Sequence, residues 1–171
     1  MYLVSACLAG FNTRYDGTNC LDERVRKLVS SGMALPVCPE QLGGLPTPRP
    51  PVEFSSGDGS SVLDGTGGVC MAAEGIGLPP DPEAFKAALV RGAQETLRMA
   101  RAYGIKKAIL KDGSPSCGTG YVHCRENCGG HCRVREEAGT FGSGKRPGRG
   151  VTAELLWREG IEVAGVDSLQ G

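Results

Sequence analysis

The chain has 171 residues, the length of one domain, and this is enough to bury a hydrophobic core without disulfide bonds. Its 19 lysine and arginine residues balance its 19 aspartate and glutamate residues, so net charge provides no attraction to nucleic acid or to an anionic membrane. No stretch approaches the 18 or more apolar residues of a membrane span. We therefore expect a single domain, residues 1–171, that acts on a small molecule without a nucleic-acid or membrane partner.

The first residues resemble a secretory signal only superficially. Residues 4–7 read V-S-A-C, as in a lipoprotein cleavage box, but no charge and no long apolar stretch precede Cys7. We therefore expect a cytoplasmic protein. In that reducing compartment eight cysteines favour thiolate chemistry or a metal over disulfides, while Cys20 and Cys70 are expected to be small buried residues.

The N-terminal part of the chain predicts a strand, a helix and a second strand. Tyr2 to Ala6 is a short apolar run, typical of a buried strand. Apolar residues then recur at helical spacing between a capping Asp22 and the terminating Gly32. The second strand is expected at Ala34 to Val37.

The middle of the chain predicts little regular structure. The segment from Pro39 to Phe54 is rich in proline and carries two adjacent glycines, which favours a fixed, extended loop. Ser61 to Leu63 and Val69 to Ala72, separated by Asp64-Gly65, are predicted to form a β-hairpin.

The C-terminal half predicts two helices and two strands. The longer helix opens with the cap Asp81 and ends at Gly104. A strand at Ile105 to Leu110, a helix at Thr152 to Arg158 and a strand at Ile161 to Val166 follow. Alternation of strands and helices predicts an α/β fold with a parallel sheet, right-handed crossovers and helices on both faces.

Three cysteines are predicted to meet at one edge of this sheet. Cys7 and Cys38 directly follow the first two strands, and Cys117 lies in the loop after the third. Ligands of open parallel sheets bind beyond the carboxyl ends of the strands. Compact thiolates suit an iron–sulfur cluster or zinc, and three ligands instead of four leave a position open for a substrate. The alternative is that these cysteines are small packed residues.

Several motifs occur together and in order along the chain: Ser5-Ala-Cys-Leu-Ala-Gly10, Arg14-Tyr-Asp-Gly17, Val37-Cys-Pro-Glu40, Leu42-Gly-Gly-Leu-Pro-Thr-Pro-Arg-Pro-Pro51, Ser114-Pro-Ser-Cys-Gly118 and Gly150-Val-Thr-Ala153. Together they resemble the thiouracil desulfidase family, and the resemblance spans Tyr2 to Val166.

The resemblance implies a Rossmann-like, three-layer α/β domain that binds a 4Fe-4S cluster through three cysteines, matching Cys7, Cys38 and Cys117. The fourth iron is free to capture a thiocarbonyl sulfur. The implied enzyme is a non-redox desulfidase that converts 2- or 4-thiouracil, or its nucleoside or nucleotide, into the oxo base and hydrogen sulfide. By motif position the assisting catalytic residues are Glu40 and Ser114, although a solvated carboxylate and a turn-forming serine are the alternatives.

Four further residues are weaker candidates for substrate binding. Arg14 and Asp16 follow the first-strand loop, Arg49 lies between prolines, and Lys111 ends the third predicted strand. A structural turn explains the first two equally well, and surface solvation explains the basic side chains taken singly.

The chain departs from the family in a cysteine-rich loop insertion at about 120–139. Cys124, Cys128 and Cys132 follow a C-x3-C-x3-C spacing beside His123 and His131. This density of ligands indicates a second metal site, for zinc or another iron–sulfur centre. The alternatives are a glycine-rich loop with reduced thiols, or a loop cysteine that closes the open iron of the first cluster. Beyond the loop, Lys145, Arg146 and Arg149 form a basic patch that can contact a substrate phosphate.

Two other classes of function compete with the enzyme. One is an iron–sulfur or sulfur-carrier protein that passes sulfide without hydrolysing a substrate, and the other is a structural zinc protein. An open iron with Glu40 and Ser114 beside it favours chemistry over storage.

Overall fold

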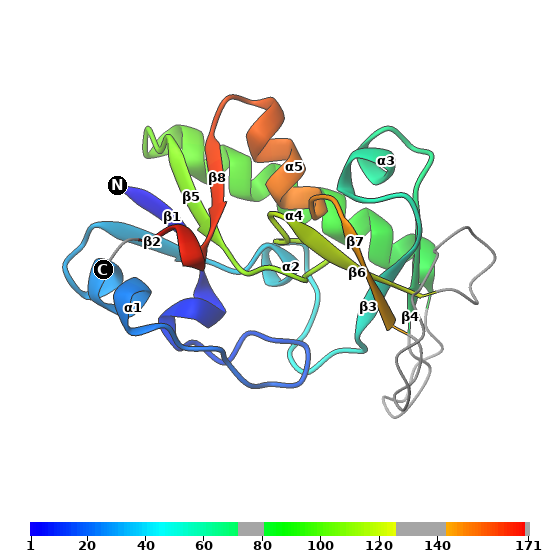
Figure 1. The fold of residues 1–171 in the computed structure, drawn as a ribbon, viewed down its shortest axis with the longest axis horizontal. Coiled ribbons are helices and arrows are strands. Elements are labelled where there is room, and N and C mark those ends of the chain that lie inside the picture. Colours follow the sequence, from blue (N-terminus) through cyan, green and yellow to red (C-terminus); the bar gives the residue numbers. More distant parts are fainter. Residues whose placement is uncertain (72–80, 126–142, 170–171) are drawn as a thin grey trace.

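The structure is a computed structural model that describes residues 1–71, 81–125 and 143–169. It contains two four-stranded sheets, and the long helix α4 (Pro82–Ala102) runs behind both (Figure 1). The first sheet has the order β2-β1-β5-β8 and is parallel throughout. Its strands are β1 (Tyr2–Ser5), β2 (Ala34–Val37), β5 (Lys107–Leu110) and β8 (Glu162–Gly165).

Helices cover both faces of this parallel sheet, as the alternating pattern predicts. Leu3 and Leu110 pack against α4 and α5 (Val151–Arg158) on one face. Val4 and Ile109 point to the other face, where α1 (Glu23–Ser30) buries Val25. Neighbouring strand residues thus serve opposite layers, which confirms the α/β fold. Two short 3-10 helices, η1 (Ala6–Ala9) and η2 (Val166–Ser168), follow the first and last strands.

The second sheet is mixed and was not expected from the sequence. Its order is β4-β3-β6-β7, in which β3 and β6 are parallel and the outer pairs antiparallel. The strands are β3 (Val52–Ser56), β4 (Gly68–Met71), β6 (Tyr121–Arg125) and β7 (Ser143–Pro147). Phe54 and Val122 are buried against Phe85 and Leu89 of α4. The helix α4 therefore supplies a core to both sheets.

Two predictions for the middle of the chain are wrong. The proline-rich segment is not free of regular structure, because it contains the helical turn α2 (Pro39–Leu42) and strand β3. Pro39 fits the first turn of a helix, where no backbone N–H is needed. The expected strand at Ser61 to Leu63 is the helix α3 (Gly59–Leu63), capped by Asp58, which accepts hydrogen bonds from the backbone N–H of Ser60 and Ser61. Strand β4 exists as expected, but its hairpin partner is β3.

Close packing of α2 against α4 depends on two glycines. A Cβ atom on Gly92 would lie 1.9 Å from the carbonyl oxygen of Pro39, and one on Gly43 would lie 2.1 Å from that of Ala88. Only glycine allows the two backbones to approach this closely. Because α2 begins directly after Cys38, this contact fixes the position of that cysteine. Among the described residues, no helix combines the length and apolarity that a membrane crossing requires.

Candidate active site

The three predicted ligands line one cavity of about 330 Å³. Cys7 lies in η1 after β1, and Cys38 lies at the N-terminal cap of α2 after β2. Cys117 lies in the turn that follows β5. The carboxyl edge of the parallel sheet therefore brings together the cysteines that the sequence places there.

The cysteines affect one another electrostatically. The pKa of the Cys7 thiol is raised, first by a hydrogen bond with Cys20 and then by burial. Repulsion from Cys117, Cys20 and Cys38 raises it further. Burial raises the pKa of the Cys117 thiol to about 12. A hydrogen bond with Ser5 lowers this pKa, and repulsion from Cys38 raises it. Without a cation, several thiolates in this cavity would repel one another. A bound iron centre removes that penalty, so the donor set suits a thiolate-ligated cluster.

Cys20 is a member of this group that sequence reasoning assigned to the core. It is half-buried, and its backbone N–H donates to the carbonyl of Cys7 at 3.1 Å. The hydrogen bond with Cys7 lowers the pKa of the Cys20 thiol to about 7. The positive charges of Lys111 and Arg14 act in the same direction, and burial acts against them. The expectation of a buried residue is confirmed for Cys70, whereas Cys20 is only partly buried and packs against the core cluster around Val25.

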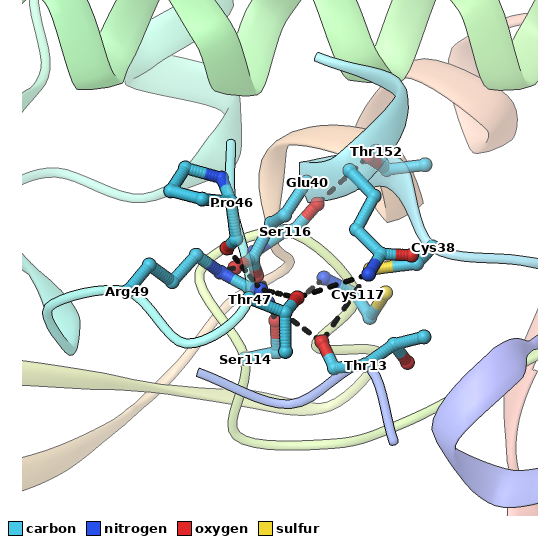
Figure 2. Close-up of polar contacts among 11 residues, drawn as sticks. Thr13, Cys38, Glu40, Pro46, Thr47, Arg49, Ser114, Ser116, Cys117 and Thr152 are labelled. Carbon is cyan, nitrogen blue, oxygen red and sulfur yellow. Dashed lines mark hydrogen bonds and ion pairs between the residues drawn. The ribbon is translucent and has the colours of Figure 1, made fainter. Parts of the chain in front are cut away.

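The turn that carries Cys117 is fixed by Ser114 and by the start of α5. Ser114 Oγ accepts hydrogen bonds of 3.1 Å from the backbone N–H of both Ser116 and Cys117 (Figure 2). The first helical N–H groups of α5, from Val151 and Thr152, donate to the carbonyls of Pro115 and Ser116. The turn thus satisfies helix donors that would otherwise lack partners.

Glu40 is held between an arginine and a serine (Figure 2). Arg49 Nε lies 2.5 Å from Glu40 Oε2, and the hydroxyl of Ser114 donates to Glu40 Oε1 at 3.3 Å. The Arg49 side chain is only 4% exposed and also donates to the carbonyls of Pro46 and Thr13 and to the Thr47 hydroxyl. Glu40 and Ser114 therefore meet beside the cysteines, as the motif positions predict.

The weaker substrate-binding candidates divide into two groups. Arg14, Arg49 and Lys111 line the cavity, although the Arg49 guanidinium is already engaged. Asp16 does not line it, and its carboxylate accepts from the N–H and hydroxyl of Thr18. A substrate contact for any of the four stays a prediction. The basic patch also lies outside the lining, with Arg149 paired to Glu154, Lys145 over the Tyr121 ring, and Arg146 in β7.

Most of the cysteine-rich loop lies outside the described residues, including Cys128, Cys132 and His131. Cys124 belongs to β6, is 1% exposed within the core around Phe54, and is disulfide-bonded. The second metal site therefore stays a prediction. Among the described residues, no three cysteine, histidine or acidic side chains surround the position of a single metal ion.

Two polar residues of the second sheet complete the cavity, and sequence reasoning missed this role for both. Glu53 of β3 and His123 of β6 line the same cavity as the cysteines. The signal for Glu53 was present in Val52-Glu53-Phe54, where polar and apolar residues alternate as in a half-buried strand. For His123 the sequence shows only its place beside Cys124.

Comparisons with known proteins place this geometry in a family. Residues 2–167 match the family model of 2-thiouracil desulfurase. The chain is 37% identical over 169 residues to the uncharacterized protein YbbK of Bacillus subtilis (strain 168), covering 99% of this chain and 97% of that protein. The solved structure of the [4Fe-4S]-dependent thiouracil desulfidase TudS is 36% identical, with a TM-score of 0.71 over 98% of this chain and 91% of its own. The chain therefore belongs to the 2-thiouracil desulfurase family.

Proposed function

We propose that this chain is an iron–sulfur enzyme that replaces the sulfur of a thiolated pyrimidine with oxygen, using a 4Fe-4S cluster held by Cys7, Cys38 and Cys117. The observation that carries the proposal is that these three thiols share one cavity with the carboxylate of Glu40 and the hydroxyl of Ser114. Membership of the 2-thiouracil desulfurase family and similarity to the 4Fe-4S-dependent enzyme TudS support it.

Each component has a separate chemical task. A cluster with three protein thiolates supplies one iron free of protein ligands, a Lewis acid able to take a thiocarbonyl sulfur. Glu40 acts as the general base, since its carboxylate can accept a proton from water as the water oxygen bonds to the carbon that carries the sulfur. The carbon–sulfur bond then breaks, and sulfur leaves with two protons as hydrogen sulfide. Water and a thiocarbonyl thus give a carbonyl and hydrogen sulfide without net oxidation.

The residues around Glu40 orient it for this task. Arg49 binds Oε2 and leaves Oε1 facing Ser114. Ser114 Oγ already accepts two backbone N–H groups, so its own proton is free to be donated to the carboxylate or to an incoming water. Carboxylate and hydroxyl therefore present one acceptor and one donor at the place where water must be positioned.

The test is anaerobic reconstitution with iron and sulfide, followed by incubation with 2-thiouracil and 4-thiouracil. The expected result is equimolar release of sulfide and uracil over many turnovers. Sulfide uptake without uracil formation would indicate a sulfur carrier instead. Protein that binds zinc and no iron, and forms no uracil, would indicate a structural metal protein. A Glu40→Gln variant with full iron content is the matched control for the chemical step.

A further inference from the structure

The cavity has a second, polar wall that the proposed chemistry does not use. Strands β3 and β6 lie parallel, with Phe54 opposite Cys124, and both of these residues are buried on the face toward α4. Their neighbours Glu53 and His123 are directed to the other face and line the cavity. The sheet thus adds a carboxylate and an imidazole to the cavity that the cysteines line.

Glu53 lines the cavity with a carboxylate of which one oxygen is buried in the protein. Its side chain is 17% exposed, and Oε2 is inaccessible to solvent and accepts no hydrogen bond. Arg125 Nε lies 3.4 Å from this oxygen, close enough for an ion pair and not aligned as a hydrogen bond. Because Oε2 is closed off from solvent, it is the exposed remainder of the Glu53 side chain that can meet a ligand in the cavity it lines.

His123 lies over the loop that carries Ser114. A Cβ atom on Gly113 would come within 2.9 Å of His123 Nε2, so the imidazole lies directly against this backbone. The Tyr121 ring contacts it edge-on, with 6.0 Å between ring centroids. Burial lowers the pKa of His123. Both the neutral and the protonated imidazole carry an N–H group, so the ring can donate a hydrogen bond in either form.

We propose that Glu53 accepts a hydrogen bond from the N3–H group of the pyrimidine ring, and that His123 donates one to the carbonyl on the other side of N3. This inference rests on the proposed function. In both 2-thiouracil and 4-thiouracil, N3–H lies between the thiocarbonyl and the remaining carbonyl. The same two contacts therefore serve both isomers, with sulfur directed toward the cysteines. Because a sugar is attached through N1, the contacts also persist in a nucleoside.

The experiment measures equilibrium binding of the product and its methyl derivatives to anaerobically reconstituted protein. The ligands are uracil, 1-methyluracil and 3-methyluracil, of which the last two are matched in size. We expect the parent protein to bind 3-methyluracil roughly 10- to 100-fold more weakly than 1-methyluracil, because a hydrogen bond to a charged acceptor is lost. In Glu53→Gln this ratio is expected to fall by at least about fivefold, with iron content unchanged.

The control variant is Arg125→Met, which removes the ion pair and leaves the Glu53 carboxylate in place. It should keep the selectivity of the parent protein. An equal ratio in the parent and Glu53→Gln, or a parent protein that does not distinguish the two methyl isomers, would overturn this inference. Failure of the proposed function has a different signature, because the reconstituted parent protein would then release no sulfide from either thiouracil.

Discussion

The guanidinium of Arg49 and the carboxylate of Glu40 form an ion pair beside the cysteines, with 2.5 Å between Nε and Oε2. The two side chains are 4% and 13% exposed. Arg49 also donates to the Thr13 carbonyl, which accepts from the Cys38 thiol as well. The ion pair therefore connects the proposed base with the backbone around a proposed cluster ligand.

We predict that Glu40→Gln lowers turnover of thiouracil roughly 10²- to 10⁴-fold, equivalent to about 3 to 5 kcal/mol in the barrier. Glutamine keeps the shape of the side chain but cannot take a proton from water. Iron and acid-labile sulfide should match the parent protein, because Glu40 is not a ligand. A variant with full iron and near-parental turnover would exclude Glu40 as the base.

Removing Arg49 should destabilise the fold. Arg49→Met leaves the carboxylate of Glu40 without its cation, and we expect a loss of about 3 to 5 kcal/mol in the free energy of unfolding. Arg49→Lys keeps the charge but cannot reach the same acceptors, so it should rescue only part of this loss. Urea unfolding provides the measurement. The matched control is Arg98→Met, which breaks an exposed ion pair with Glu95 and should change stability little. Equal effects of the two methionine variants would contradict the prediction.

Alanine at Cys7, Cys38 or Cys117 should prevent full cluster assembly, since each removes a thiolate from the same cavity. Iron, acid-labile sulfide and charge-transfer absorption of the reconstituted variants are the measurements. Cys20→Ala is a close control, because Cys20 hydrogen-bonds with Cys7 and is not one of the proposed ligands. Full iron in any of the first three variants removes that cysteine from the ligand set, and loss of iron in Cys20→Ala adds a fourth.

Gly92→Ala should destabilise the protein although alanine is the better helix former. The added methyl group meets the Pro39 carbonyl at 1.9 Å, so α2 must move away from α4. We expect a net loss of about 1 to 3 kcal/mol. Gly120→Ala is the control, because a Cβ atom there meets nothing within 4 Å. Thermal unfolding distinguishes the two, and equal midpoints would show that the helices separate without cost.

The parallel sheet and the meeting of its cysteines were predictable because both follow from local rules. Buried strands appear as apolar runs, and parallel strands end at one edge, which brings Cys7, Cys38 and Cys117 together. Pairing between distant strands has no such local signal. Strand β3 pairs with β6, about 70 residues later in the chain, so the second sheet was missed along with the wall formed by Glu53 and His123.

Within the site, too, the sequence predicts which residues lie near one another but not which of them form contacts. The motif positions of Glu40 and Ser114 indicate that both lie near the cysteines, but not that Arg49 neutralises one of them from within the protein. Its place between prolines suggested a substrate contact, whereas its four acceptors are all protein groups. A buried arginine looks like a surface arginine in a sequence, because burial depends on how α2 and the following loop pack.

The last prediction concerns the titration of His123. Burial is the main cause that lowers its pKa below the ordinary 6.5, Lys145 and Lys111 lower it further, and Glu53 acts in the opposite direction. Between that folded pKa and 6.5 the unfolded chain binds a proton that the folded protein does not, so this histidine makes stability fall as the pH drops through that window and has no effect above it.

Variants that remove a charge near this imidazole should shift its pKa in a direction that depends on the charge removed. Glu53→Gln removes the group that, among the described residues, favours protonation, and should lower the pKa of His123 still further, whereas Lys145→Met should raise it. Lys86→Met should leave it unchanged, because Lys86 of α4 is not among the groups that shift the pKa of His123. The midpoint can be followed by NMR of the ring protons, with His123→Asn assigning the resonance against His131. A His123 midpoint that rises in Glu53→Gln would show that the carboxylate does not face the imidazole, and would remove the electrostatic basis for a shared polar wall.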